Sequence, residues 1–248
     1  MKNLALAFLA TALMSTTLDA AFTFTHTGSN DPASEGWSVL GPGSNVTAGP
    51  VTNDLGTGLN AWNVNDPTTG GGSTLQYQMF PTAAQGSAGL QFGWQFDVRV
   101  RVVNTPDAPD AGISVEYFDG VARFGLEIGS TANGDPTVDF FLTNSAFTLT
   151  GGGSSYHLYS VRYNASTSTA ALYIDGVQRL SGVTGSASGV APEIDWGARG
   201  SATAGNGNYN LVQLTIVPEP STWAFVLVGV ASIVALYKRR QKNVVTAA

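Results

Sequence analysis

Two carboxylates late in the chain have a spacing that suits acid–base chemistry. Glu193 and Asp195 occupy alternate positions, and alternate residues of a strand point to the same face. Facing carboxyl groups are the usual machinery of glycoside hydrolysis. Residues 196–198 are Trp, Gly and Ala, so no acid follows to act as a partner at the ~5.5 Å that a retaining mechanism requires. Pro192 indicates that a strand begins here. We therefore predict no catalytic residue.

Other catalytic chemistries have less support. The chain has no cysteine, which excludes disulfides, a thiolate metal site and a cysteine nucleophile. Its two histidines, His26 and His157, lie far apart in the sequence, and no Gly-x-Ser-x-Gly turn leads into a helix. We predict that His157, at the start of a strand, is a cross-strand partner and not a base.

Calcium is the metal ion that the sequence best accommodates. Oxygen-rich segments at residues 53–54, 63–66 and 107–110 could supply carboxylate and carbonyl ligands for a hard cation. The alternative is that these residues form turns with local hydrogen bonds. No cofactor is required on either interpretation. The candidate calcium ligands are Asn63, Asn65 and Asp66.

Aromatic residues offer a second kind of binding site. Trp62 and Trp196 are candidates for stacking against sugar rings on an exposed platform. The alternative is that they pack in the core, as most tryptophans of a sandwich do.

The charge of the central part of the chain excludes two classes of partner. Residues 21–220 contain six arginines, no lysine and sixteen acidic residues, a net charge of −10, whereas the whole chain carries −6. Nucleic acids and anionic membranes are bound through basic patches. We therefore expect no nucleic acid partner.

The residues between the two ends are typical of strands separated by turns, without a convincing amphipathic helix. From Phe92 to Val103 apolar residues alternate with charged ones, which indicates one buried and one solvated face. Asp-Gly pairs at 119–120 and 175–176 each join two β-rich runs, a strong hairpin signal. Residues 28–74 are expected to be mostly loops, interrupted at 36–39 and 59–66. Roughly a dozen short strands predict one all-β sandwich or jelly roll over residues 21–216.

Both ends have the composition of export segments. Residues 1–20 combine one lysine with an apolar run and a candidate cleavage site, which predicts a signal peptide. The run from Trp223 to Tyr237 has no charge and would span about 22 Å as a helix. Basic residues follow it at 238–242, and these favour the cytoplasmic side. We predict a single C-terminal transmembrane helix over 223–237, followed by a tail at 243–248.

The C-terminal arrangement resembles a known sorting signal. Pro218, Glu219 and Pro220 precede the apolar run and its basic end, and this order is similar to the PEP-CTERM signal of Gram-negative bacteria. The resemblance covers residues 217–242. It implies a secretion translocon, a transient membrane anchor and an exosortase that sends the protein to the cell surface or the extracellular exopolysaccharide matrix.

A second resemblance covers the central domain. The stretch from His157 to Tyr163, a polar turn and the stretch from Ala171 to Val177 resemble the heart of a laminin-G or concanavalin A-like domain. This resemblance implies a jelly-roll sandwich, with calcium at its edge in many members. Glycanases of that class carry Glu-x-Asp-x-x-Glu on one strand, and this chain lacks the second Glu.

We therefore predict an exported, non-catalytic surface or matrix protein that binds or embeds in exopolysaccharide, and not an enzyme. Two alternatives remain open. One is a divergent glycan-degrading hydrolase, and the other is a structural matrix protein without a ligand.

Overall fold

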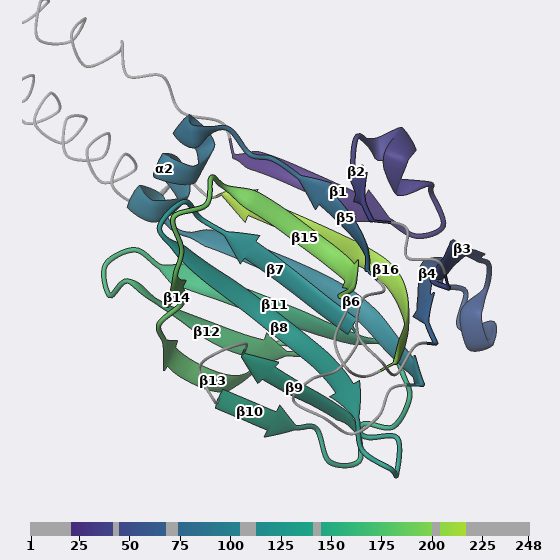
Figure 1. Cartoon of the computed structure of the whole chain (residues 1–248). Helices are drawn as coiled ribbons and strands as arrows, with labels where there is room; N and C mark the ends of the chain where they lie inside the picture. The colour runs from purple at the N-terminus through teal and green to yellow at the C-terminus, as the bar shows by residue number, and fades with distance from the viewer. Residues whose placement is uncertain are drawn as a thin grey trace, which may run out of the picture. The chain divides into compact units, whose positions relative to one another are not determined.

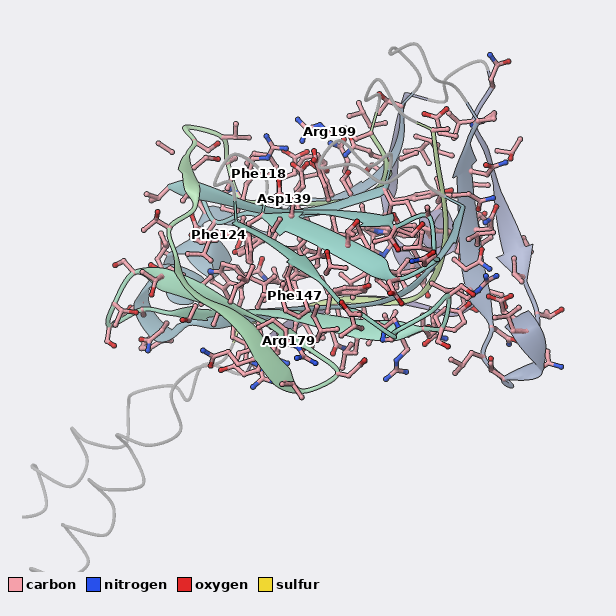
Figure 2. The ribbon with its side chains drawn as sticks, turned by 90° about the horizontal axis from the view of Figure 1, so that it is seen from below. Phe118, Phe124, Asp139, Phe147, Arg179 and Arg199 are labelled. Carbon is pink, nitrogen blue, oxygen red and sulfur yellow. The ribbon has the colours of Figure 1, made fainter. Side chains whose placement is uncertain are left out.

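The computed structural model describes residues 21–41, 45–67, 74–104, 113–140, 145–199 and 204–216. In these residues the chain forms two antiparallel sheets, which lie as two layers in Figure 2. The all-β sandwich predicted from the sequence is thereby confirmed. The predicted signal peptide at 1–20, the sorting motif Pro218, Glu219 and Pro220, and the segment 223–237 lie outside the described residues. Among the described residues, no helix has the length and apolar content needed to cross a bilayer.

The first layer, sheet A, is built on two long strands, β6 and β16, which pair along most of their length. In the described residues the order of its strands is β13 (Val177–Val183), β12 (Thr169–Ile174), β11 (His157–Asn164), β6 (Trp94–Asn104), β16 (Gly205–Ile216), β4 (Ala61–Asp66) and β3 (Thr47–Val51), with β1 (Phe22–Thr27) also paired to β16.

The second layer, sheet B, has β7 and β15 near its middle (Figure 1). In the described residues its order is β10 (Ser145–Thr148), β9 (Pro136–Phe140), β8 (Ala122–Ser130), β7 (Ile113–Phe118), β15 (Glu193–Ala198), β5 (Leu75–Met79) and β2 (Ser38–Leu40), with the short β14 (Ser186–Ala187) paired to β8.

The core fills the space between the layers. Alternate residues of β6, such as Val98 and Val100, face it from sheet A, and Val115 and Tyr117 of β7 face it from sheet B. The opposite residues of each strand therefore point outward. The alternation predicted for residues 92–103 is confirmed, although the strand begins at Trp94.

Both Asp-Gly hairpins form as predicted. The first joins β7 to β8 and the second joins β12 to β13. Asp175 and Gly176 both have positive φ, which is the conformation of a tight type I′ hairpin turn.

The expectation for residues 28–74 is confirmed in part, and the absence of a helix is wrong. β2 and β4 overlap the two expected interruptions, whereas β3 and two short 3-10 helices, η1 (Pro32–Glu35) and η2 (Asp54–Gly56), were not predicted. One α-helix, α2 (Ala83–Phe92), stands where none was expected. Thr82 and Gln85 form a capping box at its start, each side chain accepting from the other residue's backbone N–H, and this sequence signature is visible at 82–85.

Candidate functional site

Sheet B carries a group of polar side chains on its outer face. On β15, Ile194 and Trp196 point into the core, so Glu193 and Asp195 point to the outside. On the neighbouring β7, Val115 and Tyr117 are core residues, which places Glu116 on the same outer face. We call Glu193, Asp195 and Glu116 the carboxylate cluster.

The strand register brings this cluster together. Asp195 is paired with Glu116 of β7 on one side and with Gln78 of β5 on the other. The amide of Gln78 donates to Oε1 of Glu193 over 2.5 Å. Three strands thus place one amide and three carboxyl groups beside each other.

Asp195 is held in its protonated form. Its side chain is 6 % exposed. Burial, followed by the negative charge of Glu193, raises the pKa of Asp195 to about 8. A hydrogen bond from Gln78 lowers this pKa, while the charge of Glu116 and a hydrogen bond with Glu193 raise it further. The Oδ1 atom has no hydrogen-bond partner among the described residues. At neutral pH the cluster therefore contains a carboxylic acid that can donate a proton.

Glu116 has a different environment. It is 2 % exposed and is held by two arginines. Arg123 donates through Nε to Oε2 over 2.7 Å, and Arg199 donates to Oε1. Burial raises the pKa of Glu116 to about 7, against the opposing charge and hydrogen bond of Arg199. In Figure 2 Arg199 and Phe118 lie on the outer side of sheet B. Because its oxygens are engaged by guanidinium groups, Glu116 is a fixed part of the site and not a mobile acid.

The sequence prediction missed the cross-strand members of this cluster. Pro192 does precede the first residue of β15, as expected. Ala198 occupies the position that the second Glu of the glycanase pattern would have, and it faces the core. The acidic neighbour comes instead from β7, at Glu116. The period-two pattern of residues 113–118 places Glu116 on the side of the strand opposite the core, but it gives no sign of pairing with β15.

The candidate calcium ligands do not converge. Asn63, Asn65 and Asp66 belong to strand β4 and not to a loop, so Asp66 points to the face opposite the two asparagines. The Nδ2 of Asn63 donates to the side-chain oxygens of Asn206 and Asn208, each over 2.6 Å. In the part of the chain that the structure describes, no three His, Asp or Glu side chains are grouped to hold a metal ion. Residues 107–110 lie outside that part.

The two tryptophans proposed to stack on sugars do not form an exposed platform. Trp196 has 0 % exposure, and its ring stacks on His26 with centroids 4.6 Å apart. Trp62 is half-buried, and its Nε1 donates to the Tyr77 hydroxyl over 2.8 Å. The prediction is wrong for Trp196, which is a core residue because it lies on the inner face of β15.

His157 has the structural role that we predicted. It pairs in register with Val100 of β6, and its Nδ1 lies 2.7 Å from Oδ2 of Asp175 in the turn between β12 and β13. His26 is buried and contacts Glu35, with 2.6 Å between Nδ1 and Oε2. Neither ring belongs to the carboxylate cluster.

No protein-family model and no curated protein matches this chain. Several solved structures do. A conserved carbohydrate esterase from the Shiga toxin-encoding bacteriophage phi24B is 18% identical, with a TM-score of 0.55 over 79% of this chain and 99% of its own. A transglycosylase in complex with NAG is 11% identical, with a TM-score of 0.50 over 77% of this chain and 83% of its own. A Bacillus licheniformis beta-glucanase is 14% identical, with a TM-score of 0.43 over 80% and 99%.

The chain shares its fold with enzymes. The esterase and the transglycosylase are both enzymes by name, and at these identities the likeness concerns the fold alone. Our prediction that the chain is not an enzyme is overturned by this finding. Its premise was that an incomplete Glu-x-Asp pattern on one strand leaves no acid–base group, whereas the sheet brings a third carboxylate and a protonated aspartate to the same face.

Proposed function

We propose that the chain is a glycan-active enzyme that breaks glycosidic bonds at the outer face of sheet B. The observation that carries the proposal is the pair on β15. Asp195 keeps its proton to about pH 8, and it stands beside Glu193, which is more exposed and lies at the start of the strand. Cleavage of a glycosidic bond usually requires a proton donor and a neighbouring carboxylate.

Each member of the pair has one role in the proposed step. Asp195 donates its proton to the glycosidic oxygen, while a Glu193 oxygen bonds to the anomeric carbon and the carbon–oxygen bond breaks. Asp195, now a carboxylate, then takes a proton from water or from a sugar hydroxyl, whose oxygen displaces Glu193. We assign this retaining course because Glu193 raises the pKa of Asp195 by its charge and a hydrogen bond, which places the two carboxyl groups nearer than the about 6.5–9.5 Å of an inverting enzyme.

Gln78 and the arginine-bound Glu116 do not contact the substrate in this proposal, but they position and tune Glu193 and Asp195. The amide of Gln78 fixes one Glu193 oxygen, and the negative charge of Glu116 helps to hold the proton on Asp195. The two arginines keep Glu116 in place. They are positioning residues in this proposal.

We further propose that the substrate is an extracellular polysaccharide. The fold is shared with a carbohydrate esterase and a transglycosylase. The sandwich is compatible with the concanavalin A-like and laminin-G-like resemblance of its hairpins. The signal peptide at 1–20 and the PEP-CTERM segment at 217–242 would take the protein through the translocon and an exosortase to the cell surface. We propose no calcium site on Asn63, Asn65 and Asp66.

The test is cleavage of a panel of purified polysaccharides by the full chain, with Glu193→Gln and Asp195→Asn variants. We expect new reducing ends or altered chain lengths with at least one glycan. Each variant should lose activity by about 10²–10⁴-fold, the usual contribution of an acid or base. Activity should also fall as pH rises past about 8, because Asp195 then loses its proton.

The matched control is Asp97→Asn, the same change on the outer face of sheet A, where Asp97 accepts two hydrogen bonds from Gln95. It should keep full activity. The proposal is wrong if both cluster variants retain the activity of the unmodified chain on a glycan that the chain cleaves. It is equally wrong if no glycan of the panel is altered.

A further inference from the structure

Sheet A contains a junction where two strands meet along one edge of a third. The long strand β16 has two different partners along one edge. β4 pairs with its first half, up to Tyr209, and β1 pairs with its second half, from Leu211. Asn210 stands between the two, where the register with β6 also shifts. Such a bulge changes the direction of a side chain and bends the strand.

A groove opens at this junction. Its volume is about 510 Å³, within the range of roughly 300–1,000 Å³ found for small-molecule sites. Six of its ten lining residues have polar side chains, two are glycines and two are leucines. The lining residues are Thr27, Gly28, Ser29, Asn30, Gly58, Leu59, Asn60, Arg99, Asn210 and Leu211.

Arg99 is the positively charged side chain among the residues that line this groove. It lies on the outer face of β6 and donates from one terminal nitrogen to the side-chain oxygen of Asn210 over 3.3 Å. This is its one polar contact among the described residues. By contrast, Arg101 binds Asp54, Arg123 and Arg199 bind Glu116, and the Arg162 guanidinium lies over the Tyr173 ring. Arg99 therefore has donors available for a ligand in a domain that is strongly acidic.

The side of the groove facing Arg99 is preorganised. Asn210 is fixed at both ends, because its amide donates to the Asn60 carbonyl over 2.7 Å and its backbone oxygen accepts from Gly28 N–H over 2.7 Å. Gly28 has a φ of 57°, which lets the chain turn closely over the bulge. The orientation of the guanidinium thus depends on strand pairing and not on a mobile loop.

We infer that this junction groove binds an anionic sugar residue. A guanidinium with free donors recognises a carboxylate or sulfate through paired hydrogen bonds. Neighbouring asparagines suit sugar hydroxyls, since an amide both donates and accepts. The groove lies on sheet A, so it is separate from the carboxylate cluster. It would hold an acidic saccharide whether or not that saccharide is cleaved.

The test measures binding of sodium glucuronate, glucose 6-sulfate and glucose to the full chain by ligand-observed NMR titration. We expect at least one of the two anions to bind, and glucose to bind at least 10-fold more weakly. Arg99→Gln should weaken anion binding by about 10- to 100-fold, the effect of losing hydrogen bonds to a charged group. Arg99→Lys should recover only part of the affinity, because lysine lacks the planar fork.

The matched control is Arg162→Gln, which removes an exposed guanidinium from β11 on the same outer face. It should leave anion binding unchanged. Equal binding of glucose and both anions, unchanged binding by Arg99→Gln, or no binding of either anion would each overturn the inference. These outcomes are distinct from failure of the cleavage proposal, because Arg99→Gln should keep the cleavage activity assigned to Glu193 and Asp195.

Discussion

The environment of Asp195 stabilises the protonated form of its carboxyl group relative to the charged form. Its pKa is raised from 3.8 to about 8 by burial and by the neighbouring Glu193 charge. A folded-state pKa above the unfolded value means that the contribution of Asp195 to folding stability is greatest below pH 4 and is lost as pH rises to about 8. Asp195 therefore destabilises the fold at neutral pH, which agrees with the acid role proposed for it.

We expect Asp195→Asn to stabilise the protein at neutral pH while it removes activity. An amide fits the same space and carries no charge, so the gain should be on the order of 2–4 kcal/mol at pH 7, from about 1.4 kcal/mol per pKa unit. The gain should vanish toward pH 4, where Asp195 is protonated in both states. Urea unfolding at several pH values measures it. A loss of stability at pH 7 would contradict this account of the cluster.

At the scale of elements, the position of β15 depends on one close approach. Gly197 has a φ of 133°, and a Cβ there would lie 2.4 Å from the Leu75 backbone oxygen on β5. Only glycine fits a backbone contact of this kind. The same strand carries Glu193 and Asp195, so the packing of Gly197 fixes the place of the carboxylate cluster.

Gly197→Ala should therefore destabilise the fold by about 2–4 kcal/mol, within the range of strained core substitutions. Gly189→Ala is the matched control, because a Cβ at that exposed position meets no atom within 4 Å. Thermal unfolding followed by circular dichroism compares them. Similar melting temperatures for the two variants would contradict the packing argument.

At the scale of the whole molecule, one buried ion pair connects distant parts of the chain. Asp54 of η2 accepts from Arg101 of β6 over 2.6 Å, from the Tyr156 hydroxyl over 2.8 Å and from Asn208 of β16 over 2.7 Å. Burial alone would raise the pKa of Asp54, but the hydrogen bonds from Arg101, Asn208 and Tyr156 lower it below its usual value. Its contribution to stability is present above about pH 4 and is lost as pH falls further.

We expect Asp54→Ala to cost about 3–5 kcal/mol at neutral pH, since it leaves Arg101 buried without its partner. The cost should shrink in acid, where protonated Asp54 no longer pairs with Arg101. Asp97→Ala, on the outer face of the same sheet, should cost much less. Denaturant titrations at pH 7 and pH 3 give both values, and equal costs at the two pH values would refute the electrostatic explanation.

The sequence by itself determined the class of the fold, because strand alternation and turn chemistry are local. The alternation around Arg99 predicted β6 with its buried and outer faces, and the Asp-Gly turns predicted the hairpins β7–β8 and β12–β13. The spacing of Glu193 and Asp195 likewise predicted that they share a face. The strand β3 and the helix α2 were missed locally, although the capping box of α2 at 82–85 is visible in the sequence.

Only the tertiary structure decided which residues meet across the sheets. Glu116 and Gln78 come from strands far from β15 in the sequence, and period-two alternation does not say which strands pair. The same pairing put Trp196 in the core and joined β1 and β4 end to end along β16, which created the groove at Arg99. Each candidate site is thus assembled by non-local strand pairing, because a single strand supplies only one row of outward side chains.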